Sequence, residues 1–235
     1  MRRKSIWLTV GILALLVGGV LATLSWMIRH EPTFYQALEI EPGPTRKQFS
    51  TDCTKNYFAL TTSIINNDPT WMARFSDDEI NSFLQEDFIR SNAFESILPE
   101  GVHSPRISID ADRIRLAMRY GTGGWQTVIT LDVRLWLVAK EPNAIAMELQ
   151  GFWAGSMPIP VKSLLDSITE AGSQNNIEVR WFRQNGNPVA IMRFQADQAR
   201  PTVQLLRLQL EDGAIVIAGQ SLLEPSGRPV ATNVD

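Results

Sequence analysis

The stretch FSDDEINSFLQEDF, residues 75–88, holds the side chains of this chain whose types and spacing most suggest chemistry. Five acids fall within these fourteen residues, and three of the five are consecutive. Carboxylates that converge on one point can bind a metal ion or act as an acid–base pair. The candidate carboxylates for such a site, including that of a hydrolase, are Asp77, Asp78, Glu86 and Asp87.

The same stretch also matches the start of a helix. Ser76 is a favoured N-cap residue, and Glu79 follows three positions later, as in a capping box. Phe75 and Ile80 have the spacing of a hydrophobic staple. Consecutive acids on a helix point about 100° apart and therefore do not converge. We interpret the stretch as a helix start, and we predict no catalytic, cofactor-binding or metal-ligating residue in it.

Other reactive residues are few. Cys53 is the one cysteine, so an internal disulfide and a cysteine-based zinc site are excluded. The two histidines, His30 and His103, lie in no recognisable nucleophile motif. The glycines of 121–124 are followed by no lysine, which indicates a turn rather than a phosphate loop. We therefore expect no cofactor and no enzymatic activity.

The N-terminal segment predicts a membrane anchor. Residues Ile6 to Ile28 carry no charge, and a helix of this length spans a hydrocarbon core about 30 Å thick. The preceding MRRK places the N-terminus in the cytoplasm and the remainder outside. We expect a single-pass protein of the cytoplasmic membrane with an extracytoplasmic domain. A signal peptide cleaved near Ala22 remains the alternative.

The charge of the chain argues against nucleic acid as a partner. The formal net charge is −3, and four of the 22 basic residues lie within the first 30 positions. The other 18 basic residues and all 25 acidic residues lie after position 30, so the part expected to be exported is acidic. Affinity for nucleic acid comes mainly from neutralising phosphates, which such a domain does poorly.

The pattern along the chain predicts an α+β fold. Prolines mark residues 30–44 as a juxtamembrane linker between the anchor, 1–29, and a domain over 45–223. The tail, 224–235, has no periodic pattern. A helix is expected over 45–66, and period-two segments with turn signals predict strands in the second half. The expected strands and hairpins are 106–110 with 113–120, 125–139, 144–153, and the pairs around QNGNP and EDG. We expect helices packed on a curved, mainly antiparallel sheet.

Arginines and aromatic residues on these strands allow two interpretations. Arg113, Arg115 and Arg119 share one face and could meet anionic head groups. The alternative is a solvated sheet face with cross-strand partners Asp132, Glu148 and Glu178. Aromatic residues could likewise line a ligand groove or belong to the core; they are Trp125, Phe152, Trp153, Trp181 and Phe182.

The helix start, followed by the segment G-x-x-x-G-x-x-PIP-x-x-x-LLDSI at 151–168, resembles an uncharacterised family of membrane-anchored bacterial proteins, the YpmS-like proteins. More distantly, the chain is similar to extracytoplasmic LmeA-like lipid-binding domains, and the resemblance covers most of residues 30–222. The resemblance implies a curved sheet wrapped against helices around an apolar groove. Asn81 and the turn at Pro158 and Pro160 match the family pattern, and we interpret both as structural.

These observations favour a non-enzymatic, membrane-anchored domain that binds an apolar ligand such as lipid. The alternative function is an envelope scaffold or assembly factor that binds another protein. An elongated apolar cavity would favour the first, and an exposed apolar patch over a solid core would favour the second.

Overall fold

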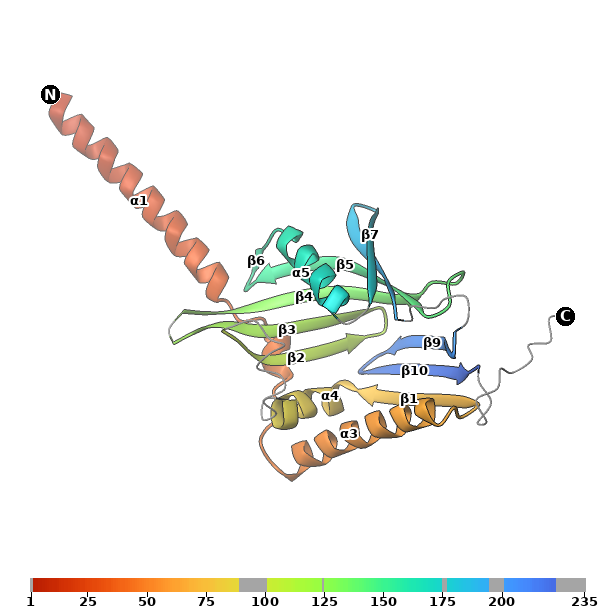
Figure 1. Cartoon of the computed structure of the whole chain (residues 1–235). Coiled ribbons are helices and arrows are strands. Elements are labelled where there is room, and N and C mark those ends of the chain that lie inside the picture. Colours follow the sequence, from red (N-terminus) through yellow and green to blue (C-terminus); the bar gives the residue numbers. More distant parts are fainter. Residues whose placement is uncertain (1, 89–100, 124, 175–176, 195–200, 223–235) are drawn as a thin grey trace.

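The computed structural model describes residues 2–88, 101–123, 125–174, 177–194 and 201–222. Helix α1, Arg2–Arg29, projects away from the remainder of the molecule (Figure 1). Within the described residues one N-terminal helix is long and apolar enough to cross a membrane, and none of its apolar window is buried. The predicted tail, 224–235, lies outside the described residues.

The α+β fold class is confirmed, with the strands divided between two sheets (Figure 1). Every strand pair that the structure describes is antiparallel. The larger sheet runs in the order β2 (Val102–Asp110), β3 (Arg113–Thr122), β4 (Trp125–Leu137), β5 (Ala144–Ala154), β8 (Asn187–Arg193) and β7 (Glu178–Gln184), with β6 (Met157–Pro158) paired to β5. The smaller sheet is β1 (Thr70–Ser76), β10 (Ala214–Ser221) and β9 (Val203–Glu211). The other helices are α2 (Thr33–Ala37), α3 (Pro44–Ile65), α4 (Asp77–Phe83), the π-helical η1 (Leu84–Phe88) and α5 (Lys162–Gln174).

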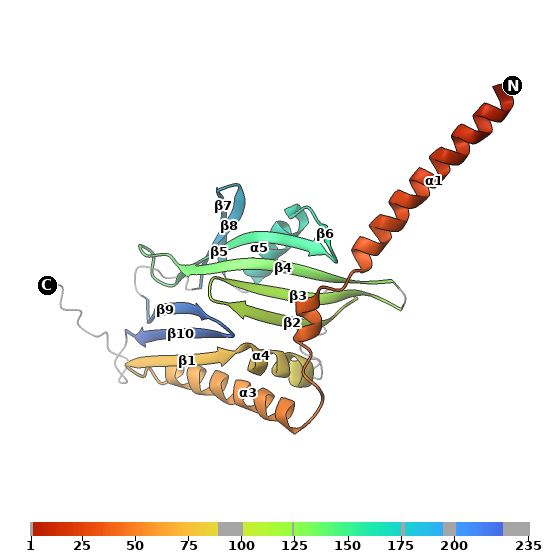
Figure 2. The ribbon, with the colours of Figure 1, turned by 180° about the vertical axis from the view of Figure 1, so that it is seen from behind.

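The two faces of the larger sheet have different covers. Alternation along β3, β4 and β5 places aliphatic side chains such as Ile114, Val133 and Leu149 on one face, where α5 packs against them. Polar side chains dominate the opposite face, and the segment that leads from α1 into α2 lies across part of it (Figure 2). We refer to these as the α5 face and the α2 face.

Two asparagine side chains connect the sheets to each other. Asn81, on the helix that follows β1, donates to the carbonyl oxygen of Ile107 at 2.7 Å and accepts from its N–H at 2.8 Å. Asn143, in the β4–β5 connection, bonds in the same way to the β9 backbone at Val203 and Leu205. Each amide therefore pairs with a strand as a neighbouring strand would, and the structural interpretation of Asn81 is confirmed.

Candidate functional site

The helix start that opens the acidic stretch forms as the sequence predicts. Ser76 Oγ accepts from the N–H of Glu79 at 3.2 Å, and Glu79 Oε2 accepts from the N–H of Ser76 at 2.8 Å. Ile80 packs on the cluster that contains Phe75, as expected of the staple. Burial raises the pKa of Asp77, and the neighbouring Asp78 adds to that effect.

The remaining two acids of the stretch attach it to α3. The α-helix stops at Phe83 and continues as the π-helix η1, which turns Glu86 inward until it is 4% exposed. Glu86 Oε1 accepts from Arg46 Nε at 2.7 Å and Nη2 at 2.6 Å. Asp87 Oδ2 accepts from Ser50 Oγ at 2.5 Å. No group of three or more His, Cys, Asp or Glu side chains could hold a metal ion among the residues described. Glu86 and Asp87 therefore join η1 to α3.

The row of arginines on β3 is paired within the protein. Arg113 Nε and Arg115 Nη2 donate to Asp110 Oδ2 at 2.9 and 2.8 Å. These bonds lower the pKa of the Asp110 carboxyl, with Arg115 contributing most. Arg119 Nη2 donates to Glu31 Oε1 at 2.8 Å and so ties the segment after α1 to the sheet.

The predicted cross-strand carboxylates differ in what they contact. Glu178 pairs with arginines on β7 and β8, in agreement with the solvated-face interpretation. Glu148 is buried and accepts from Asn187 instead. Asp132 forms no ion pair within the described residues, although Arg115 lies opposite it in the β3–β4 register. The surroundings of Asp132 are therefore the candidate site.

Tyr35 fixes the segment that borders this region. Its side chain is fully buried against Ala117 and Val128, and its hydroxyl donates to the carbonyl oxygen of Ser104 at 2.7 Å. The guanidinium of Arg106 lies 4.3 Å from the ring centroid and donates to the Tyr35 carbonyl oxygen at 2.6 Å. Residues predicted as a linker thus carry a buried aromatic side chain that holds α2 on the sheet.

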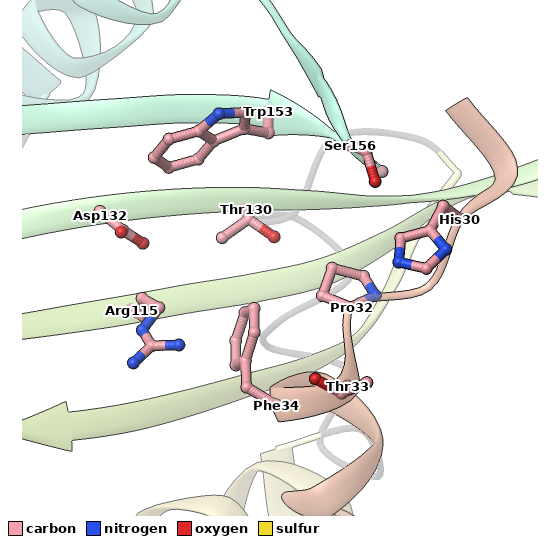
Figure 3. A pocket seen from close by; sticks show the side chains of 10 residues that line it. His30, Pro32, Thr33, Phe34, Arg115, Thr130, Asp132, Trp153 and Ser156 are labelled. Carbon is pink, nitrogen blue, oxygen red and sulfur yellow. The ribbon is translucent and has the colours of Figure 1, made fainter. Parts of the chain in front are cut away.

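A crevice of about 420 Å³ opens on the α2 face beside this segment (Figure 3). Thr130 and Asp132 of β4 form its floor, and Trp153 of β5 and Phe34 of α2 lie on opposite sides of them. Arg115 of β3 completes the lining next to Phe34, with its guanidinium 4.8 Å from the ring centroid. The crevice ends near α1, at His30, Pro32 and Ser156.

Three polar atoms of the crevice lining have no hydrogen-bond partner among the described residues. They are Thr130 Oγ1, Asp132 Oδ1 and Arg115 Nε. Thr130 is 4% exposed and Asp132 is 9% exposed. Desolvation raises the pKa of the Asp132 carboxyl, and the opposing influence of Arg115 does not cancel that rise. A donor, an acceptor and a hydroxyl are thus buried without partners in side chains that line one cavity.

A second, more apolar cavity lies between α1 and the β3–β4 hairpin. This groove has a volume of about 590 Å³. Leu21, Leu24 and Ile28 line it from α1, and Tyr120 and Trp125 line it from the hairpin. Trp125 is 76% exposed and its ring lies 4.3 Å from the Arg29 guanidinium. The groove is therefore bounded on one side by the helix that is a candidate to cross the membrane.

The end of α1 is fixed between β4 and the β5–β6 turn. Thr127 Oγ1 donates to the carbonyl oxygen of Ile28 at 2.6 Å, and the N–H of Ser156 donates to that of Met27 at 2.9 Å. Gly155 adopts φ +58°, and a Cβ there would lie 2.3 Å from the Met27 carbonyl oxygen. A glycine is thus required for this close approach.

The aromatic candidates divide between these places. Trp153 lines the crevice and Trp125 lines the groove, so two of the five border cavities. Trp181 instead donates from Nε1 to Thr169 Oγ1 at 2.8 Å and links β7 to α5. Phe182 is 39% exposed on β7. No local pattern marks Thr130 or Phe34 as a site residue, because their roles depend on chain segments far apart in the sequence.

Comparison of the chain with protein-family models, with curated proteins and with solved structures finds no match. The resemblance to YpmS-like and LmeA-like proteins stays a prediction.

Proposed function

We propose that this chain is a membrane-anchored, extracytoplasmic and non-enzymatic domain that binds lipid in the groove between α1 and the β3–β4 hairpin. The observation that carries the proposal is the groove itself. Its lining is predominantly apolar, and its volume lies in the range of about 300–1,000 Å³ typical of ligand pockets.

The position of the groove favours a ligand that comes from the bilayer. Leu21, Leu24 and Ile28 belong to the uncharged segment that we assign to the membrane. A lipid beside α1 could place an acyl chain against these residues and remain in contact with the hairpin. The proposed cytoplasmic N-terminus puts the groove at the outer surface of the cytoplasmic membrane.

The carboxyl groups of the described cavities support binding rather than hydrolysis. Hydrolysis of the glycosidase type uses two carboxyl groups that flank the scissile bond. The crevice lining includes Asp132, whereas the nearby Asp110 is engaged by two arginines. The groove lining contains no carboxylate among the residues described.

The proposal is tested by native mass spectrometry of the full chain released from detergent micelles after lipid extraction. We expect lipid adducts on the wild-type chain and their loss in Ser25→Trp, because Ser25 lines the groove and an indole would fill it. Thr23→Trp is the matched control, since Thr23 lies about 200° around α1 from Ser25. A wild-type chain without adducts, or a Ser25→Trp chain that retains them, would refute lipid binding in the groove.

An envelope scaffold is the second candidate, and α3 favours it. Phe58 and Ile65 are 61% and 77% exposed and are spaced by seven residues, so they share one side of the helix. Tyr57, which is 56% exposed, contacts Phe58 edge to face, with ring centroids 5.8 Å apart. Photo-crosslinking from position 58 in intact membranes separates the candidates. A specific protein adduct that forms equally in Ser25→Trp would support the scaffold, and the absence of an adduct would count against it.

A further inference from the structure

We propose that the crevice on the α2 face is a binding site for a neutral, hydroxyl-rich group, such as a sugar ring. The proposal goes beyond lipid binding in the groove, because the crevice and the groove share no lining residue. It stands on the geometry of the crevice floor, on the aromatic residues beside it and on its balance of charge.

The floor offers hydrogen bonds that a pair of neighbouring hydroxyl groups would satisfy. Asp132 Oδ1 can accept a hydrogen bond, Arg115 Nε–H can donate one, and Thr130 Oγ1 can do either. A hydroxyl group is both donor and acceptor, so two of them match this set. Burying polar groups without partners costs free energy, which a ligand with hydroxyl groups would recover.

The sides of the crevice offer aromatic surface to the apolar faces of such a ring. Trp153 pairs with Thr130 in the β4–β5 register, and its indole occupies the space above Gly151. A Cβ at Gly151 would lie 1.7 Å from the indole, so this position of the ring requires glycine. Phe34 faces the same cavity from α2 (Figure 3). Small-molecule sites typically have a small number of convergent polar groups between aromatic side chains.

The charges of the crevice favour a neutral ligand. Its lining contains one guanidinium, Arg115, and one carboxyl group, Asp132. An anionic ligand would meet Asp132 on the floor, and a cationic ligand would meet Arg115 beside it. A neutral hydroxyl-rich group meets no like charge and can bond to both.

The location of the crevice allows two sources for the same chemistry. Its end at His30 and Pro32 directly follows α1, so the head group of a glycolipid could reach it from the membrane surface. A soluble saccharide could enter from solvent. The shared chemistry is the neutral, polyhydroxylated ring.

The experiment measures binding of the full chain in phosphatidylcholine nanodiscs. One arm uses a printed array of neutral mono- and oligosaccharides, and the other uses phosphatidylcholine vesicles doped with glycosyl diacylglycerols. We expect binding in at least one arm, and the arm identifies the source. Asp132→Asn replaces a charged acceptor by a neutral one, and Thr130→Val removes a hydroxyl group. Each should weaken binding about tenfold, which corresponds to about 1.4 kcal/mol.

Two controls keep the test decisive. Asp112→Asn, in the exposed β2–β3 turn, should bind as the wild type does. Ser25→Trp should also retain saccharide binding, because Ser25 lines the groove and not the crevice. Binding in neither arm, or unchanged binding by both Asp132→Asn and Thr130→Val, would overturn the proposal without bearing on lipid binding in the groove.

Discussion

Asp132 is a buried carboxyl group whose position suits a ligand better than it suits stability. Its Oδ1 has no partner among the described residues, and desolvation raises its pKa. We therefore expect Asp132→Asn to increase the free energy of unfolding by about 1 kcal/mol at neutral pH, because an amide costs less to desolvate than a carboxylate. Thermal unfolding of the full chain in detergent measures the change, and a lower Tm for Asp132→Asn would contradict it.

The pH dependence of that difference has a defined sign. A raised pKa means that the folded protein holds the proton more tightly than the unfolded chain does, so stability falls as pH rises through the folded pKa. The advantage of Asp132→Asn should thus be greatest at neutral pH and disappear below the ordinary carboxyl value of 3.8. Arg115, Arg113 and Asp110 act on this carboxyl group, and His30 lies at the end of the same crevice.

Asp110 should behave in the opposite way. Its pKa is lowered by Arg115 and Arg113, so its contribution is present above 3.8 and is lost as pH falls through the folded pKa. We expect Asp110→Asn to lower the free energy of unfolding by about 1 kcal/mol at neutral pH and to have no effect in strong acid. Unfolding midpoints across the acid range test this. If Asp132→Asn and Asp110→Asn shifted Tm in the same direction at neutral pH, the environments assigned to the two carboxyl groups would be wrong.

Cys53 illustrates a residue made inert by its surroundings. The thiol is buried on α3, and desolvation, with a smaller contribution from Glu79, raises its pKa to about 11. Because the thiolate is the reactive species, we expect no modification by a thiol reagent at pH 7–8 in the native protein and full modification in denaturant. A spectrophotometric thiol assay checks this, and rapid labelling without denaturant would contradict the packing of α3 on β1.

At the scale of elements, the change from α4 to η1 shows how one irregular turn serves packing. A π-helix aligns residues five apart rather than four, and the rings of Phe83 and Phe88 meet with centroids 6.5 Å apart. The same turn directs Glu86 toward Arg46. The spacing of Ile80, Phe83, Leu84 and Phe88 in the sequence predicts one buried helical stripe. A regular α-helix, however, would not bring Phe83 over Phe88.

The asparagine that bridges α4 and β2 provides a sharp test of how the sheets are joined. In Asn81→Asp, an oxygen would replace the amide nitrogen that donates to the Ile107 carbonyl oxygen, and two acceptors would face each other. Since Asn81 is 1% exposed, we expect a loss of roughly 3 kcal/mol in the free energy of unfolding. Asn66→Asp, at the exposed end of α3, is the control and should change stability by less than about 0.5 kcal/mol. Equal effects of the two substitutions would show that the amide pair is unimportant.

Local signals account for most of the elements that the sequence predicts correctly. Ser76 with Glu79 marks a helix start, and the turns at 111–112, 185–186 and 212–213 mark hairpins that the structure contains. Strand β1 was not predicted, although Trp71, Ala73 and Phe75 alternate, because the segment is short and adjoins a strong helix signal. Its pairing with β10 joins residues about 150 positions apart, which no local pattern reveals.

The sequence patterns do not predict the crevice, for a related reason. Asp132 was read as a partner of the arginines, but Asp110 occupies both Arg113 and Arg115 and leaves Asp132 to the cavity. Phe34 enters the site through the docking of Tyr35 on Ala117. Local sequence patterns predict neither the competition between two acceptors for one arginine nor the docking of segments that are far apart in the chain.

At the scale of the whole molecule, the contacts at the end of α1 determine how the domain is oriented relative to that helix. Thr127, Gly155 and Arg119 hold the segment from Met27 to Glu31 against the sheet. Because α1 is continuous with this segment, the direction of the helix also sets the direction of the β3–β4 hairpin. The hairpin lies across the groove from Leu24 and Ile28, in the last two turns of α1. It should therefore lie at the level of the membrane–water interface.

The residues of the hairpin suit that environment. Tyr120 and Trp125 are 47% and 76% exposed, and aromatic side chains of this kind favour the interface. We expect an environment-sensitive fluorophore on Thr122→Cys to show blue-shifted emission, and quenching by nitroxide-labelled lipids, in the full chain reconstituted into vesicles. The same fluorophore on Gln184→Cys, at the exposed β7–β8 turn, is the control and should emit as in water. The buried Cys53 should not compete for the label. Equal emission and quenching at both positions would show that the hairpin stands clear of the bilayer, and the groove would then open to solvent instead of lipid.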